Sequence, residues 1–192
     1  MGLELTTQPA SEPLSTADAK LHLAVTTSDD DAHIDSLVLS ARSTLEQMTR
    51  RAFITQTYTL TRRTFGADKV LLPRPPLQSV TSVEYYPDDG GALTALAEGT
   101  DYRVDTAGNI GCIELIDGVS WPGLADRSGA VKIVYVAGYG DDGTDLPGSL
   151  LHALRLQLSE YYEPQHSQKR MDAIRSLVAL HTLHSATAFE AL

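Results

Sequence analysis

A glycine-rich segment between a predicted strand and a predicted helix is the stretch that comes closest to a chemical motif. Gly138, Gly140 and Gly143 have the GxGxxG spacing of a loop that places a dinucleotide pyrophosphate on a helix N-terminus. Asp141 and Asp142 would place carboxylates beside that phosphate and repel it. No second parallel strand follows to supply the acidic residue that holds the ribose. We therefore interpret the segment as a solvated strand-to-helix connector and predict no cofactor.

The other candidates for metal or nucleophilic chemistry each lack a necessary partner. Residues 141–145 lack the alternating ligand spacing of an EF-hand, which leaves at most an opportunistic cation site. His181 and His184 lie three apart, but no third ligand accompanies them. Cys112 lies in an apolar strand pattern without an adjacent cation, and Ser120 lacks the second glycine of a nucleophile elbow. The sequence thus predicts no catalytic residue, no metal site and no enzyme activity.

Cations are scarce, and four of them flank the junction between a predicted helix and the first predicted strand. They are Arg50, Arg51, Arg62 and Arg63. Such a cluster could pair with carboxylates of a partner protein through bidentate hydrogen bonds. Solvated charges of small energetic weight are the alternative.

Composition limits the class of protein. The 192 residues contain 15 Lys and Arg against 25 Asp and Glu, and the net charge of −10 argues against tight binding of nucleic acid. A single cysteine removes any disulfide framework and suggests a reducing compartment. No run approaches the ~18 apolar residues of a membrane span, so we expect a soluble protein without membrane contact. The first six residues predict a flexible N-terminus.

Two helices are predicted before residue 52. Ser15 can cap a short helix, with Asp18 completing a capping box. A longer helix should begin in the acidic stretch Ser28–Asp31 and reach about Arg50, because carboxylates stabilise the first turn. Its apolar stripe follows steps of three and four. The stripe consists of Ile34, Leu37, Val38, Ala41, Leu45 and Met48.

After the second helix the sequence becomes rich in β-branched and aromatic residues, which predict short strands. The expected strands are 54–64, 69–72, 80–86, 101–105, 112–116 and 131–139. Helical patterns return from Pro147 to about Pro164 and from Met171 to about Leu183. Because no helix separates the strands, we predict an α+β protein in which N- and C-terminal helices pack together around an inserted antiparallel β lobe or small barrel. The expected parts of this one composite domain are residues 1–52, 53–145 and 146–192.

Several segments together resemble the head-tail connector (adaptor) proteins of tailed bacteriophages and gene transfer agents. The resemblance covers residues 13 to about 163. It rests on residues 13–23 with the acidic stretch 28–31, on 51–58 and 72–80, and on 131–139 followed by Leu146-Pro147.

The resemblance implies a structural virion protein. Its subunits would form a ring, commonly of twelve, between the portal and the stopper (tail-completion) protein, and DNA would pass through the lumen without specific binding. The expected location is the virion or gene transfer agent particle, after assembly in the bacterial cytoplasm. A net charge of −10 agrees with a bore that repels a polyanion.

A ring requires two different contact patches on each subunit, and the two long predicted helices are our candidates for them. The residues proposed for contact with subunits or partners are Leu37, Leu45, Arg50, Arg51, Leu154, Leu158, Tyr161 and Tyr162. We also expect the segment from Met171 onward to become ordered on docking to the portal, because short helices are marginal alone.

Two alternatives stay open. One is a small-ligand or carbohydrate-binding β module, whose pocket would be lined by aromatic residues. These are Tyr85, Tyr86, Tyr102, Trp121 and Tyr139. The other is the neighbouring stopper protein, which is also a small ring-forming subunit.

Overall fold

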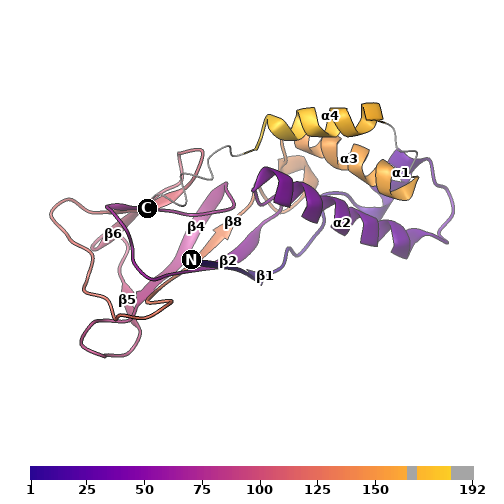
Figure 1. Cartoon of the computed structure of the whole chain (residues 1–192). Coiled ribbons are helices and arrows are strands. Elements are labelled where there is room, and N and C mark those ends of the chain that lie inside the picture. Colours follow the sequence, from indigo (N-terminus) through magenta and orange to yellow (C-terminus); the bar gives the residue numbers. More distant parts are fainter. Residues whose placement is uncertain (164–167, 183–192) are drawn as a thin grey trace. The chain divides into compact units, whose positions relative to one another are not determined.

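The structure, a computed structural model, describes residues 1–163 and 168–182 in two compact units (Figure 1). The β unit comprises Met1–Gln8 and Thr55–Gly138, and the helical unit comprises Pro9–Ile54 and residues 139–182. Helices and antiparallel sheets together confirm the predicted α+β class. Leu183, His184 and the remaining tail of the predicted C-terminal part lie outside the described residues, as does His166.

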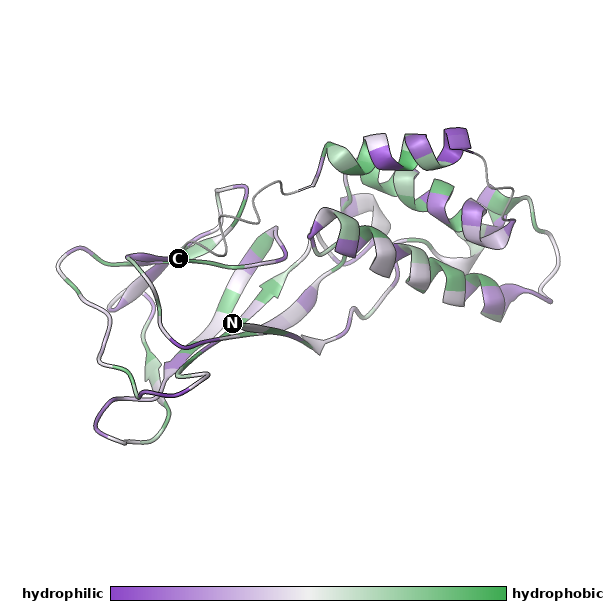
Figure 2. Cartoon of the chain, viewed as in Figure 1, coloured by the Kyte–Doolittle hydropathy of each residue, from purple (hydrophilic) through white to green (hydrophobic). Residues whose placement is uncertain are grey.

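The helical unit packs the N-terminal and C-terminal helices into one core, as predicted. It contains α1 (Thr16–Leu23), α2 (Asp31–Thr49), α3 (Gly148–Tyr162), α4 (Gln168–Ala179) and the short 3-10 turn η1 (Gly143–Asp145). Helix α3 packs against both α2 and α4, and α1 packs against α2 and α3. The buried stripes that meet there include Ile34, Val38, Leu45, Leu150, Leu154, Leu158, Ile174 and Val178. Figure 2 shows the alternation of hydrophobic and hydrophilic residues along these helices.

Local sequence explains where α1 and α2 begin and end. Ser15 is the N-cap of α1: its hydroxyl oxygen accepts from the Asp18 backbone N–H at 3.1 Å. The Asp18 carboxylate accepts from the Ser15 hydroxyl, not from the backbone as in the predicted box. Helix α2 begins at Asp31, three residues after Ser28, because residues 28–30 form a turn. It ends where Arg50 adopts a left-handed φ of 57°.

The segment from Met171 onward, which we expect to become ordered on docking, includes most of helix α4, and its residues 183–192 lie outside the described residues. The helix begins at Gln168 in the chain by itself, and Ile174 and Val178 are buried in the helical core. Burial of this apolar face against α3 supplies the stability that an isolated short helix lacks.

The β unit contains a five-stranded antiparallel sheet in the order β1-β2-β8-β4-β5. The strands are β1 (Gly2–Thr7), β2 (Gln56–Arg62), β8 (Val131–Ala137), β4 (Leu77–Tyr85) and β5 (Thr94–Leu96). A second antiparallel sheet has the order β3-β7-β6, with β3 (Lys69–Leu71), β7 (Cys112–Leu115) and β6 (Tyr102–Asp105). In the central strand β8 buried residues alternate with half-buried ones, which explains its clear sequence pattern.

The predicted flexible N-terminus is wrong, because Gly2–Thr7 forms the edge strand β1. Leu3 pairs with Leu60 and Leu5 pairs with Tyr58. Nearly every residue of β1 is exposed, so the strand lacks the alternating burial that its detection from sequence requires. The short edge strand β5 was missed for the same reason.

Candidate functional site

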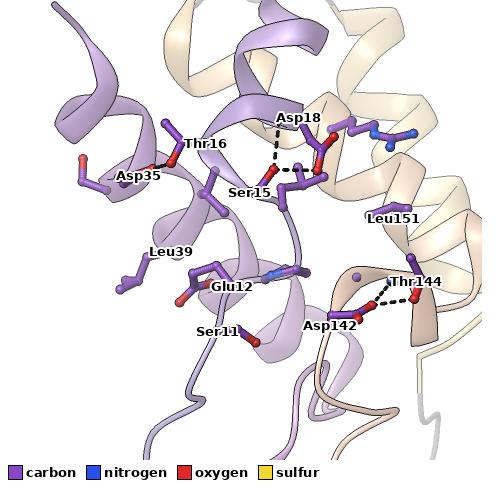
Figure 3. Close-up of a pocket in the computed structure, with 16 residues that line it drawn as sticks. Ser11, Glu12, Ser15, Thr16, Asp18, Asp35, Leu39, Asp142, Thr144 and Leu151 are labelled. Carbon is purple, nitrogen blue, oxygen red and sulfur yellow. Dashed lines mark hydrogen bonds between the residues drawn. The ribbon is translucent and has the colours of Figure 1, made fainter. Parts of the chain in front are cut away.

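A groove of about 870 Å³ lies in the helical unit (Figure 3). Side chains of Leu14, Leu39 and Leu151 give it an apolar lining. Asp18 and Asp35 stand on α1 and α2, and Asp142 stands just before η1. The groove therefore combines aliphatic surface with carboxylates.

The connector with the GxGxxG spacing forms one wall of this groove. Asp142 caps η1: its carboxylate accepts from the Thr144 backbone N–H at 2.7 Å, and these bonds to Thr144 hold the pKa of Asp142 below its ordinary value. Gly143 approaches the Pro13 carbonyl oxygen so closely that any Cβ would clash with it. The glycine thus serves a close backbone approach within the helical unit, and not a phosphate.

The three carboxylates have only uncharged partners. Asp35 accepts from the Thr16 hydroxyl at 2.7 Å, and Asp18 accepts from Ser15 at 2.6 Å. Within residues 1–163 and 168–182, neither these two nor Asp142 forms an ion pair. Arg155 is the one cation among the lining residues of the described chain. The groove is therefore suited to a ligand that carries positive charge next to an apolar group.

Glu12 also lines the groove, but its charge is neutralised from inside. The Arg42 guanidinium donates to both Glu12 carboxylate oxygens, at 2.7 and 3.0 Å, and to Glu46 at 2.9 Å. Glu46 in turn accepts from the backbone N–H of Phe53 at 2.7 Å. This buried network fixes the segment before α1 and the segment after α2 onto one helix.

The structure divides the eight predicted contact residues into two groups. Leu45, Leu154 and Leu158 have no exposed surface in the chain by itself. Leu37 and Tyr161 are half-buried against the same core. The other group consists of the remaining three residues, Arg50, Arg51 and Tyr162.

These three polar residues differ in their surroundings. Tyr162 is half-buried and donates its hydroxyl to Asp30 at 2.9 Å. Arg51 is largely buried and donates from Nε to the His181 carbonyl at 2.8 Å, which ties the chain after α2 to the end of α4. Arg50 is exposed and has no ion-pair partner in the described chain. The contact role of all eight residues stays a prediction.

Leu180 is an exposed residue that sequence reasoning missed. Its side chain is 74% exposed and directly precedes His181, whose carbonyl Arg51 holds. The His181 ring shares a 2.7 Å hydrogen bond with Ser149, which gives this residue a structural role. Leu180 and Arg50 are both exposed, and each is adjacent in sequence to one partner of the Arg51–His181 hydrogen bond; we call these two residues the basic knob. An exposed leucine beyond the core stripe of α4 is the sequence signal that could have found it.

Asp105, Cys112 and Glu114 form the one cluster in the described residues with metal-ligand types close together, their ligand atoms within 4.8 Å of one another. Lys69 pairs with one Glu114 oxygen, and Arg103 donates to the other at 3.0 Å. Burial, with Glu114 nearby, raises the pKa of the Cys112 thiol to about 11, so it is neutral near pH 7. The cluster is a structural charge network across β3, β7 and β6.

Glu114 gives a pH-dependent prediction. Hydrogen bonds from Lys69, and then from Arg103, hold its pKa below the ordinary value, so its stabilising effect is present above the ordinary glutamate pKa and is lost as the pH falls through the folded pKa. Glu114→Gln should lower the free energy of unfolding at pH 7. The difference in this free energy between the variant and the wild type should shrink as the pH is lowered. Denaturant unfolding at several pH values measures this, with Asp117→Asn as the exposed control. A difference that does not change down to about pH 3 would contradict the ion-pair role.

Three of the five aromatic residues of the ligand-binding alternative, Tyr86, Tyr102 and Trp121, have packed surroundings in the structure. Trp121 stacks on Phe65 with ring centroids 4.1 Å apart and donates its indole N–H to the Ala67 carbonyl. Tyr102 is buried, and the Arg127 guanidinium covers the Tyr86 ring at 4.1 Å. Packing therefore accounts for these residues.

The fold has clear counterparts among solved structures. One matching chain comes from the neck of an empty gene transfer agent (GTA) particle computed with C6 symmetry, and others come from the neck of a native GTA particle computed with C12 symmetry and from a native GTA virion. In each case the TM-score is 0.78 at 24% identity, and the match covers 97% of this chain and 98% of the other. This chain has the fold of a GTA neck protein. The resemblance seen in the sequence over residues 13 to about 163 is thus confirmed.

No protein-family model and no curated protein matches the sequence. Within residues 1–163 and 168–182, no helix combines the length and apolar character that crossing a bilayer takes.

Proposed function

We propose that this chain is a non-enzymatic structural subunit of the neck of a tailed phage or GTA particle. In this role it is a head-tail connector that forms a ring between the portal and the stopper protein, with DNA passing through the lumen. The observation that carries the proposal is the whole-chain fold match to neck structures computed with C12 and C6 symmetry. Because the match covers 97% of this chain and 98% of the other, its support for the proposal extends over nearly the whole chain.

The charge of the chain supports passage of DNA without adhesion. With 15 basic against 25 acidic residues, the surface repels phosphates at the ionic strengths where basic proteins bind them. The acidic groove also supports passage of DNA without adhesion, because a phosphate placed there would face Asp18, Asp35 and Asp142.

The test of the function is binding to a portal. Full-length protein mixed with portal-bearing, tailless particles should add an axial ring of density beneath the portal in electron micrographs, because a connector subunit closes around the channel axis. Particles without portal are the control and should gain nothing. Protein that stays monomeric and unbound would overturn the proposal, and protein that binds only to preassembled necks would identify the stopper role instead.

A further inference from the structure

The geometry points to a contact between successive copies of this chain in which the basic knob of one copy, Leu180 with Arg50, occupies the acidic groove of the next. This inference rests on the proposed function, because a closed ring is what requires two complementary patches on each subunit. It names the occupant of the groove and the two surfaces that close the ring.

The chemistry of the two surfaces is complementary. The groove offers Asp35 and Asp18 without ion-pair partners in the described chain, next to Leu39, whose side chain is 50% exposed. The knob offers the exposed Leu180 and the exposed Arg50, which flank the two residues joined by the Arg51–His181 hydrogen bond. An apolar anchor and a cation thus meet an apolar lining flanked by carboxylates, the pairing that interface cores and their rims use.

The same two surfaces cannot satisfy each other within one chain. Asp35 and Arg50 lie fifteen residues apart on and just beyond α2, which at a rise of 1.5 Å per residue separates them by ~22 Å. Because the patches differ, a contact between them is head-to-tail and propagates from copy to copy. A rotation that closes such a series produces a ring.

The exposed surface between the two patches agrees with a protein contact. From Ser36 to Met48 the charged residues of α2 are Arg42 and Glu46, and both are buried in their own network. The exposed residues of that stretch are Ser36, Leu39, Ser40, Gln47 and Met48, all uncharged. Figure 2 also shows that α4 begins hydrophilic and becomes hydrophobic toward its C-terminal end, where the knob follows. Depletion of charge is what distinguishes interface cores from the rest of a protein surface.

The first test is a cross-link between the two patches. In the full-length variant Leu39→Cys with Leu180→Cys, assembled on portal-bearing particles, mild oxidation with copper phenanthroline should produce a ladder of disulfide-linked multimers. Either cysteine alone should give no ladder, and the native Cys112 is buried. Leu93→Cys with Leu180→Cys is the matched control, because Leu93 is an exposed leucine of the β unit.

The second test reverses charges. Asp35→Lys added to the cysteine pair should lower the yield of linked multimers at least ~tenfold, because like charges would then face each other, and further addition of Arg50→Glu should restore it. Asp117→Lys, an equal charge change on the exposed surface of the β unit, should leave the yield unchanged.

The outcomes separate this inference from the proposed function. A ring on the portal without a Leu39–Leu180 ladder overturns the inference and leaves the function standing. A Leu39→Cys chain that links to the portal protein instead also overturns it. Failure to form any ring on the portal overturns both.

Discussion

Replacing Arg42 with alanine should lower the free energy of unfolding of the helical unit by about 3–5 kcal/mol. Arg42 is almost fully buried and binds the carboxylates of Glu12 and Glu46 together. Its removal takes away the guanidinium that joins the carboxylates of Glu12 and Glu46, and breaking a buried ion pair by removing one partner is strongly destabilising. The segment after α2 should loosen as well, because Glu46 also holds the Phe53 backbone N–H.

Denaturant unfolding followed by circular dichroism at 222 nm measures this effect, because most of the helix lies in the helical unit. The matched control is Arg175→Ala, whose guanidinium pairs with Asp172 at 3.4 Å on the exposed surface and should contribute at most about 1 kcal/mol. A loss below about 1 kcal/mol for Arg42→Ala would show that water or a rearranged side chain replaces the guanidinium.

Periodicity predicted α2 and α3 because each of them buries one continuous stripe. The steps of three and four in α2 and α3 identified Ile34, Val38, Leu154 and Leu158 as one side of a helix, and all four are in the core. The same reasoning found β8, whose buried residues alternate. It failed for β1, since an exposed edge strand has no buried face to impose a pattern.

The groove could not be predicted from the sequence, because its walls come from four separate segments. Residues 11–18, the first half of α2, the connector before α3 and α3 itself meet only after folding. Leu39 was the one sequence signal for an exposed apolar surface at the groove. It follows Leu37 and Val38 in a run of three apolar residues, and a helix cannot direct all three side chains toward one core.

An apolar stripe reveals that a helix face is covered, but not by what. Leu45, Leu154 and Leu158 were predicted to contact neighbouring subunits, and in the chain by itself α3 is covered by both α2 and α4. These leucines can therefore affect contacts with a neighbouring subunit only indirectly, by holding the helical core in shape. Leu39 and Leu180, like Leu21, are exposed leucines of the helical unit that a neighbouring subunit can reach directly.

This distinction gives the prediction with the other largest effect. Leu158→Asp should cost about 5 kcal/mol or more, because it removes a fully buried side chain and places a carboxylate among apolar groups. That loss is comparable to the whole stability of a small domain, so the helical unit should unfold instead of releasing a folded monomer. Leu39→Asp, on an exposed position of α2, should change the unfolding free energy by no more than about 0.5 kcal/mol.

Circular dichroism and native mass spectrometry of the two variants, side by side, separate folding from assembly. Leu158→Asp should lose helical signal, and Leu39→Asp should keep it while losing its place in the ring on the portal. A Leu158→Asp chain that stays fully helical and monomeric would mean that Leu158 faces a neighbouring subunit after all, because only a side chain outside the core could accept a carboxylate at so small a cost.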